Sequence, residues 1–343
     1  MSRHRRRQFL KGAGLGFAAL TTFHAEALAA APASPQDRIQ VGVIGPGGMG
    51  SSHLQALLDR QDVLVSHVCD VDSTRLAAAA QVVRDKSAHA PQAVTDLRRI
   101  LDDQAVDAVF IATPDHWHAP ATILACAAGK HVYVEKPCAH NLREGRLMVE
   151  AARRADRVVQ VGTQSRSTEH VIAAMRALRE GIIGDVLVAK AWNSQRRGSI
   201  GHQQPTDPPD HLDFDLWLGP APAQPYQANL LHSVWRWWYA FGAGDIGNDG
   251  VHDMDLARWG LGVETHPSRI TALGGKYFFD DDQQWPDTQY VVFEYSGAAP
   301  SGTPRQLVFE QRIWSPYVQE GHENGNAFYG TKGMMILGKK SGW

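Results

Sequence analysis

The chain has 343 residues, 43% of them hydrophobic and 20% charged, a balance typical of a folded globular protein and not of a disordered one. This length exceeds what one hydrophobic core usually organises, so we expect two domains. The formal net charge of −2 provides no electrostatic basis for binding nucleic acid, and we expect no such partner.

The first 37 residues are predicted to stand apart from the domains. Residues 3–7 are strongly basic, residues 12–20 form a short apolar stretch, and residues 27–30 read Ala-Leu-Ala-Ala. This order is typical of a secretory signal whose apolar part is too short for a stable membrane span. The pair Arg6-Arg7 resembles a twin-arginine signal, the alternative being a disordered basic tail. We expect a signal peptide at 1–30, a linker at 31–37, and a periplasmic or otherwise exported protein.

A glycine-rich turn follows the first predicted strand. Residues 41–44 form an apolar run of strand length, and residues 49–60 have the spacing of a helix. A G-x-G-x-x-G pattern lies between them, and it contains Gly45, Gly47, Gly48, Met49 and Gly50. Gly45 allows a tight turn, Gly47 lets the backbone approach a pyrophosphate, and Gly50 lets helix and strand pack closely. Free N–H groups at the helix start would then face the phosphates.

An acidic residue ends the second predicted strand. Residues 63–68 are followed by Asp70, about 20 residues beyond the last glycine of the turn. A carboxylate there can accept hydrogen bonds from a ribose diol and would repel a 2′-phosphate. An isolated glycine pattern also occurs in ordinary loops, but this acidic strand end favours a dinucleotide site. We predict NAD as the cofactor, with NADP the less favoured alternative.

Strand and helix patterns alternate from residue 38 to residue 161. Helical patterns at 73–83, 97–102, 115–128 and 141–155 alternate with strand patterns at 106–112, 131–134 and 158–161. This alternation predicts a doubly wound parallel sheet of the Rossmann type, in which ligands bind beyond the carboxyl ends of the strands. Thr113, Pro114, Glu135 and Lys136 fall at such ends. The pair His116 and His118 lacks a third ligand at a suitable spacing, so we expect no metal.

Residues 162–343 are predicted to form a second, α+β domain. A helical pattern at 168–180 precedes alternating patterns at 184–192, 268–279, 288–295, 306–313 and 327–337. These predict an open, mainly antiparallel sheet with helices on one side. An apolar outer face on that sheet would favour a homo-oligomer. The chain stops at Trp343 after a strand pattern, so it is either a compact protein or a fragment.

A lysine with chemical potential follows the strand at 131–134. Pro137 disfavours a helical conformation for Lys136, so the side chain should project from the strand end. An ammonium group there could hydrogen-bond a substrate hydroxyl and stabilise the alkoxide that develops as hydride leaves. The alternative is an ordinary solvated lysine.

A candidate acid–base residue lies on a later predicted helix. Asn248, His252, Asp255 and Trp259 are spaced at i, i+4, i+7 and i+11, so they share one helix face. Asn248 is predicted to cap the helix start. The His252 imidazole could accept a proton near neutral pH, with the Asp255 carboxylate orienting it. The alternative is a histidine on the helix surface.

Aromatic residues are densest just before this helix, at residues 235–239. The faces of tryptophan rings can stack on sugar C–H surfaces, and an arginine can bind hydroxyl groups. We therefore predict that Trp235 and Arg236 contact a carbohydrate substrate. The alternative is that these aromatic side chains form the core between the two domains.

Four motifs together resemble the Gfo/Idh/MocA family of glucose–fructose oxidoreductase and inositol dehydrogenase. They are the glycine turn, the Ala-Thr-Pro-Asp-His-Trp-His run at 112–118, Glu135-Lys136-Pro137, and Gly250-Val-His252-Asp-Met-Asp255. The resemblance implies a nicotinamide-dependent oxidoreductase acting on a sugar, cyclitol or related polyol, with Lys136 and His252 as catalytic residues. It implies that the turn containing Pro114 and His118 lies near the nicotinamide. Exported members of the family agree with the predicted signal.

One position departs from the family pattern. Many dehydrogenases that the chain resembles carry Asp where Asn248 stands, and an amide can orient a hydroxyl but cannot take its proton. Two alternatives to sugar oxidation therefore stay open. One is an NAD-dependent glycosidase, in which transient oxidation permits elimination of the aglycone with no net redox change. The other is a non-catalytic, NAD-bound sensor.

Overall fold

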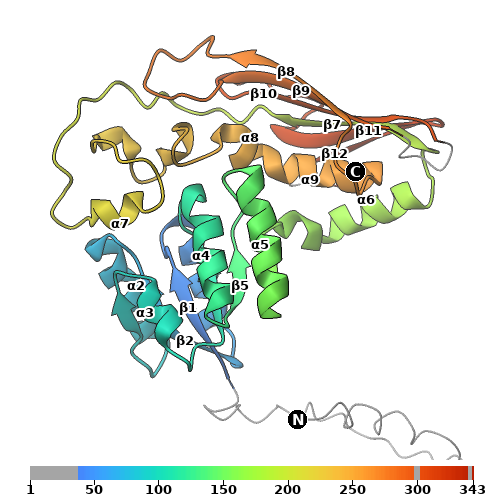
Figure 1. The fold of residues 1–343 in the computed structure, drawn as a ribbon. Helices are drawn as coiled ribbons and strands as arrows, with labels where there is room; N and C mark the ends of the chain where they lie inside the picture. The colour runs from blue at the N-terminus through green and yellow to red at the C-terminus, as the bar shows by residue number, and fades with distance from the viewer. Residues whose placement is uncertain (1–37, 297–301, 339–341) are drawn as a thin grey trace, which may run out of the picture.

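The computed structural model describes residues 38–296, 302–338 and 342–343, and these build two six-stranded sheets (Figure 1). The predicted signal peptide and linker lie outside the described residues. The predicted α/β class, with a Rossmann sheet and a second mainly antiparallel sheet, is confirmed. None of the helices in the described ranges has the length and apolar character needed to cross a membrane.

The first sheet is entirely parallel, with the strand order β3-β2-β1-β4-β5-β6. Its strands are β1 (Ile39–Ile44), β2 (Val63–Cys69), β3 (Gln92–Val94), β4 (Ala108–Ile111), β5 (His131–Val134) and β6 (Val159–Val161). Its helices are α1 (Gly48–Leu58), α2 (Ser73–Lys86), α3 (Arg98–Asp102), α4 (Asp115–Ala127) and α5 (Leu142–Ala155). Sequence patterns missed β3, which has three residues and no buried side chain.

Helices on both sides of this sheet explain why its strands are so apolar. Side chains of β1 and β2 pack with α1 and α2 in one buried cluster, whereas side chains of β4 and β5 pack with α4 and α5 in another. A strand that is covered on both faces must be apolar at nearly every position. The strand ends that carry polar residues are thereby left at the carboxyl edge of the sheet.

The second sheet has the order β12-β11-β7-β10-β9-β8. Its strands are β7 (Val186–Asn193), β8 (Arg269–Gly275), β9 (Thr288–Tyr295), β10 (Arg305–Arg312), β11 (Asn324–Gly330) and β12 (Met334–Gly338). Strands β7 and β10 are parallel, and all other neighbours are antiparallel. Helices α6 (Glu169–Arg179) and α9 (Gly250–Leu261) lie on the side facing the first domain (Figure 1). The single strand predicted at 327–337 is wrong, because a turn at 331–333 divides it into a hairpin.

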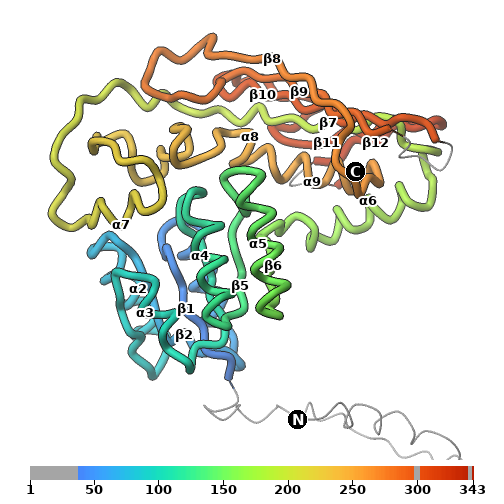
Figure 2. The backbone as a smooth tube through the Cα atoms, in the orientation of Figure 1, coloured from blue at the N-terminus to red at the C-terminus, as the bar shows by residue number. Residues whose placement is uncertain are grey.

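A long segment between β7 and α8 (Gly244–Asn248) returns to the first domain. It contains α7 (Phe214–Leu218) and the short 3-10 helices η3 (Ala228–Leu230) and η4 (Trp235–Trp237), while η2 (Gln164–Ser167) precedes α6. Figure 2 shows the segment, in yellow, descending beside α2. The Ser73 N–H donates to the His211 carbonyl at 2.8 Å, and the Asp213 N–H donates to the Val71 carbonyl at 2.9 Å. The segment is thus fastened to the chain just after β2.

The prediction that Asn248 caps the helix that carries His252 is wrong. Asn248 ends the short helix α8, and α9 starts at Gly250 after Asp249, whose side chain makes no capping hydrogen bond. The Asn248 side-chain amide instead donates to Asp245 Oδ1 at 3.0 Å. A glycine-rich stretch allowed two helices where the periodicity alone indicated one.

Candidate active site

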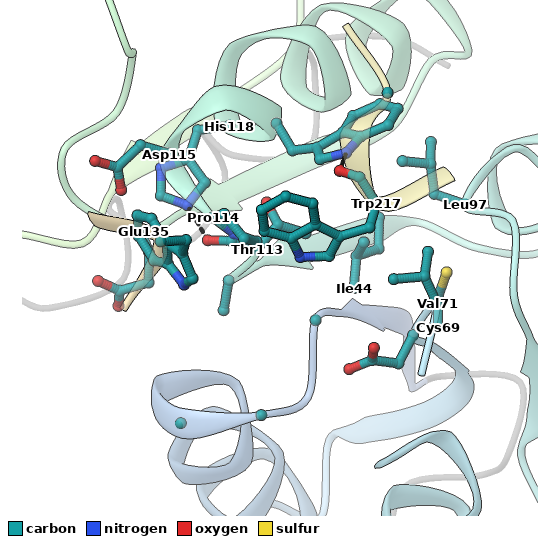
Figure 3. Close-up of a pocket in the computed structure, with 18 of the residues that line it drawn as sticks. Ile44, Cys69, Val71, Leu97, Thr113, Pro114, Asp115, His118, Glu135 and Trp217 are labelled. Atoms are coloured by element: carbon teal, nitrogen blue, oxygen red, sulfur yellow. Dashed lines mark hydrogen bonds between the residues drawn. The ribbon is translucent and has the colours of Figure 1, made fainter. Parts of the chain in front are cut away.

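The carboxyl edge of the first sheet opens into a cavity of about 590 Å³, a size typical of small-molecule sites. Figure 3 shows Thr113, Pro114, His118 and Glu135 on one side of it and Ile44, Cys69 and Val71 on the other. Of the predicted site residues, those that line the cavity are Gly45, Gly47, Gly48, Met49, Asp70, Thr113, Pro114, His118, Glu135, Lys136, Trp235, Arg236 and Asn248. Gly50, His252 and Asp255 are not among the lining residues.

The glycine turn has the shape needed to hold a pyrophosphate. Gly45 has φ of +77°, and a Cβ there would lie 2.9 Å from the backbone of Ala112. A Cβ on Gly50 would collide with the Gly45 carbonyl oxygen, so only glycine allows helix α1 to pack this closely on the turn. Nothing lies within 4 Å of a Cβ built on Gly48, and no side chain caps the start of α1. The first N–H groups of α1 can therefore donate hydrogen bonds to a dinucleotide phosphate, and the residues present fit that group.

Asp70 lies at the end of β2, as the position of a ribose-binding carboxylate requires. Its Oδ1 accepts the Asp72 N–H at 3.0 Å. Burial raises the pKa of Asp70 to about 6, since hydrogen bonding and the nearby Arg75 only partly offset the loss of water. A diol that donates to this carboxylate would favour its charged form.

Lys136 joins the two domains. It follows β5, with a cis Lys136–Pro137 bond, and its ammonium donates to the Asn248 carbonyl at 2.6 Å and to Asn248 Oδ1 at 3.3 Å. Burial lowers the pKa of Lys136, and the charges of Asp249, Asp115 and Glu135 oppose this shift. The Lys136 side chain therefore projects from the strand end, as predicted, and its ammonium group contacts the end of helix α8 in the second domain.

A buried polar network beyond Asn248 was missed by sequence reasoning. Asp245 is fully buried and accepts hydrogen bonds from Asn193 at 2.6 Å and from Arg197 at 2.9 and 3.2 Å. Arg197 also pairs with Asp249. Because Asp245 accepts from the Asn248 amide, Asn248 Oδ1 is left to face the Lys136 ammonium. The network thus fixes which way the Asn248 amide points.

The two predicted residues on α9 lie beyond this network. His252 is half-buried about one turn past Asn248, and its N–H donates to the Asp249 carbonyl at 3.0 Å. Both carboxylate oxygens of Asp255 accept hydrogen bonds from Arg166, at 2.7 and 2.8 Å. Asp255 therefore has a cationic partner on η2, which competes with its expected role in orienting the imidazole.

Two other predicted residues hold strand ends in place. The buried His118 ring contacts the Pro137 carbonyl at 2.7 Å and the Thr113 carbonyl at 2.8 Å, and so it links the ends of β4 and β5. Glu135 contacts His53 Nε2 and Gln164 Nε2, both at 2.7 Å. Burial opposes the charge on Glu135, but the hydrogen bonds from His53 and the Lys136 N–H bring its pKa below the ordinary value.

The aromatic run at 235–239 divides between core and cavity. Trp237 and Trp238 are buried in the core of the long segment. Trp235 and Arg236 line the cavity, and the Arg236 guanidinium lies 4.9 Å from the centre of the Trp235 ring. The core interpretation therefore applies to Trp237 and Trp238, whereas contact of Trp235 and Arg236 with a carbohydrate stays a prediction.

Asp115 is a further cavity residue that the sequence did not single out. It begins α4, is only 3% exposed, and accepts the Ala243 N–H at 3.2 Å. Burial raises the pKa of Asp115 to about 7, against the opposing charges of Lys136 and Arg236. A carboxyl group that titrates near neutrality therefore lies beside the amine and the guanidinium.

This raised pKa predicts a pH-dependent stability. A carboxyl whose folded-state pKa exceeds its unfolded value stabilises the fold at low pH, and this contribution is lost as pH rises through about 7. As pH rises from about 5 to about 8, the free energy of unfolding of Asp115→Asn should therefore increase by about 2–3 kcal/mol relative to that of the wild-type protein. Urea unfolding of both proteins across this range measures the difference. A difference that does not change with pH would contradict the assignment.

Family models match the chain in two parts. The model described as "Oxidoreductase family, NAD-binding Rossmann fold" matches residues 39–163, and the one described as "Oxidoreductase family, C-terminal alpha/beta domain" matches residues 186–294. These parts contain the glycine turn, Lys136 and Asn248. The first domain is thus an NAD-binding Rossmann domain.

Similar proteins include enzymes of two kinds. A glycosyl hydrolase family 109 protein of Shewanella pealeana is 29% identical over 54% of this chain, and one of Saccharopolyspora erythraea is 31% identical over 51%. The matches cover only 45% and 41% of those relatives. Among solved structures, WlbA dehydrogenase of Bordetella pertussis with NADH and UDP-GlcNAcA has a TM-score of 0.67 at 20% identity, covering 89% of this chain and 81% of that one. Levoglucosan dehydrogenase with NADH and levoglucosan has a TM-score of 0.65 at 22% identity, covering 88% and 73%.

Proposed function

The chain belongs to the Gfo/Idh/MocA oxidoreductase family, and we propose that it transfers hydride between NAD and a hydroxyl-bearing carbon of a sugar, cyclitol or related polyol. One observation carries the proposal. The Lys136 ammonium, at the tip of a Rossmann strand, meets Asn248 of the second domain in the same cavity as the glycine turn. A substrate hydroxyl in that cavity would therefore find a cationic donor near the cofactor.

The residues divide into two groups in this proposal. The glycine turn and Asp70 would hold NAD, whose nicotinamide when bound accepts or supplies hydride. Lys136 would donate a hydrogen bond to the reacting hydroxyl and stabilise the alkoxide, exchanging its present contact with the Asn248 carbonyl. Asn248 would orient the hydroxyl, and His252, which does not line the cavity, would accept its proton through an intervening water.

A second candidate is glycoside cleavage without net redox change. The glycosyl hydrolase family 109 relatives favour it, as does an amide at Asn248, which cannot itself take a proton. In this variant the same Lys136 ammonium would stabilise a transient ketone and the enolate formed from it. The aromatic wall of Trp235 would contact the sugar or its aglycone.

One experiment separates these functions. The purified protein is denatured and any released dinucleotide is identified, and native protein is then screened with free sugars and aryl glycosides. NADH formation on a free sugar supports oxidation. Release of the aryl group without accumulating NADH supports cleavage. Bound dinucleotide with neither activity on any sugar points to the sensor alternative and would sink both enzymatic proposals.

We also propose export through the twin-arginine route, on the basis of the basic cluster and Arg6-Arg7. Such export moves folded proteins, so NAD could be bound before the protein leaves the cytoplasm. Periplasmic fractions should contain the processed chain, and Arg6→Lys combined with Arg7→Lys should retain it in the cytoplasm. Unchanged periplasmic recovery of the double variant would exclude this route.

The second sheet supports a homo-oligomer. On the face of this sheet that points away from the helices, four large apolar side chains are exposed: Leu273, Tyr290, Tyr329 and Met334. We infer that a second copy covers this face, because contiguous exposed apolar surface marks association sites. Light scattering should give a multimer, and Leu273→Lys together with Tyr290→Lys should dissociate it. A monomeric wild-type protein at micromolar concentration would overturn the inference.

A further inference from the structure

Arg236 belongs to the walls of two adjacent cavities. It lines the main cavity with Lys136 and Asn248, and it also lines a smaller one of about 240 Å³. Ser233 is the other residue that the two cavities share. The smaller cavity lies below the size of a typical small-molecule site and suits a single substituent of a larger ligand. A substituent entering it from the main cavity would pass the guanidinium.

The charge of Arg236 is not balanced by an ion pair. Arg197, across the smaller cavity, pairs with both Asp245 and Asp249. Within residues 38–296 and 302–338, by contrast, the guanidinium of Arg236 has no carboxylate oxygen at ion-pair distance. Its contacts are the Ser233 carbonyl and the face of the Trp235 ring, and its buried Nε lacks a hydrogen-bond partner. Arg236 is half-buried, so water reaches only part of its guanidinium, and a ligand anion would supply the partner that the buried side lacks.

The carboxylate with the largest influence on Arg236 does not remove the imbalance. Asp115 favours the charge of Arg236 more than any other group does, while Asp245 and Asp249 are already held by Arg197. Burial raises the pKa of Asp115 to about 7, so this carboxyl is only partly ionised at neutral pH. Lys136 adds a second positive charge to the same cavity. Asp249 and Glu135 act on the Lys136 charge, so Arg236 is the cation of this cavity that an anionic ligand group would pair with.

We propose that the substrate is an acidic sugar, whose carboxylate pairs with Arg236 while its reacting hydroxyl lies at Lys136. This proposal rests on the proposed function and names the substrate class for the same site. A guanidinium presents a planar fork that matches a carboxylate with two parallel hydrogen bonds. Trp235, against which the guanidinium is stacked, offers a ring face for the sugar. A neutral sugar would leave Arg236 unpaired.

The test compares substrate charge with residue charge. Binding of a hexose, the corresponding hexuronate and the hexose 6-phosphate to the NAD-loaded protein is measured by calorimetry, which does not depend on turnover. The hexuronate should bind at least ~10-fold more tightly than the hexose, the scale of one good charge-assisted contact. In Arg236→Gln this advantage should disappear, so that the hexuronate and the hexose bind within about threefold of each other. A stronger preference for the phosphate would overturn the assignment of a carboxylate.

A matched variant controls for the loss of charge. Arg196 is exposed, lines neither cavity, and lies in the same segment. Arg196→Gln should therefore keep the full preference for the hexuronate. If Arg236→Gln does not fold, the wild-type protein still decides, because rising salt should weaken binding of the hexuronate and leave the hexose unaffected. Equal affinities in low salt, or a preference that survives in Arg236→Gln, refute the proposal.

Failure of this proposal is distinguishable from failure of the proposed function. Turnover of neutral sugars without any preference for the acidic ones would leave the enzymatic activity standing and remove the acidic substrate class. Selective binding of hexuronates without NADH formation or release of an aglycone would remove the enzymatic activity and leave the preference for acidic sugars standing. It would keep Arg236 as the anion contact of a binding protein.

Discussion

Replacing Lys136 by alanine is expected to lower kcat by at least ~10²-fold, which is the scale of losing a positioned hydrogen-bonding or acid–base group. The ammonium is the only part of this side chain that could meet a reacting hydroxyl, and alanine leaves only a methyl group. The Asn248 oxygens, which now accept from Lys136, would then lose that donor. Steady-state kinetics on the sugar found by screening, with kcat and KM determined separately, measures the effect. Loss confined to KM would indicate substrate binding alone.

Lys130 provides a matched control for Lys136→Ala. It is 3% exposed, precedes β5 where Lys136 follows it, and donates from its ammonium to the Asp103 carbonyl at 2.7 Å. Lys130→Ala therefore removes the same charge and a buried hydrogen bond far from the cavity. It should lower the free energy of unfolding by about 1–3 kcal/mol without changing turnover per folded molecule. Turnover of Lys136→Ala within about threefold of wild type would remove this residue from the mechanism.

The Rossmann domain was readable from sequence because its physical requirements are local. Strands covered on both faces are apolar throughout, as residues 41–44 illustrate, and turns between strand and helix need glycines such as Gly45. The strand ends then necessarily share one edge of the sheet. That is why Asp70, Thr113 and Lys136 could be expected in one cavity before any coordinates.

The polar network around Asn248 could not be read in the same way. Arg197 and Asp245 lie 48 residues apart, and Arg197 belongs to a proline-rich segment without strand or helix periodicity. Their meeting depends on how that segment folds back, which no local pattern encodes. The same limit applies to Asp255, whose helical spacing suggested His252 as its partner although Arg166 holds both its oxygens.

Gly50→Ala is expected to have the largest effect on the cofactor site without touching a ligand. The added Cβ would collide with the Gly45 carbonyl oxygen and would lie 2.9 Å from the Gly45 carbonyl carbon. Both are backbone atoms of a tight turn, so neither can rotate away as a flexible side chain would. Helix α1 would have to move from β1, at a cost of about 1–3 kcal/mol, the usual range for overpacking.

The displacement of α1 should also remove the dinucleotide. The N–H groups at the start of this helix are positioned by the contact between Gly45 and Gly50, so a shift of the helix misplaces the donors for the pyrophosphate. We expect the purified Gly50→Ala protein to carry less than about a tenth of the wild-type dinucleotide, a deficit equivalent to roughly 1.4 kcal/mol of binding. Urea unfolding and quantification of the dinucleotide released on denaturation measure the two effects independently.

Gly145→Ala is the control for this substitution. Gly145 lies inside α5, and the nearest atom to a Cβ built there is the Ala139 Cβ, at an ordinary contact distance of 3.7 Å. Alanine suits a helix interior better than glycine, so the free energy of unfolding of this variant should rise by about 0.5–1 kcal/mol. Its dinucleotide content should equal that of the wild-type protein. If Gly50→Ala behaved like Gly145→Ala in both measurements, the close contact between strand turn and helix would not be what shapes the phosphate site.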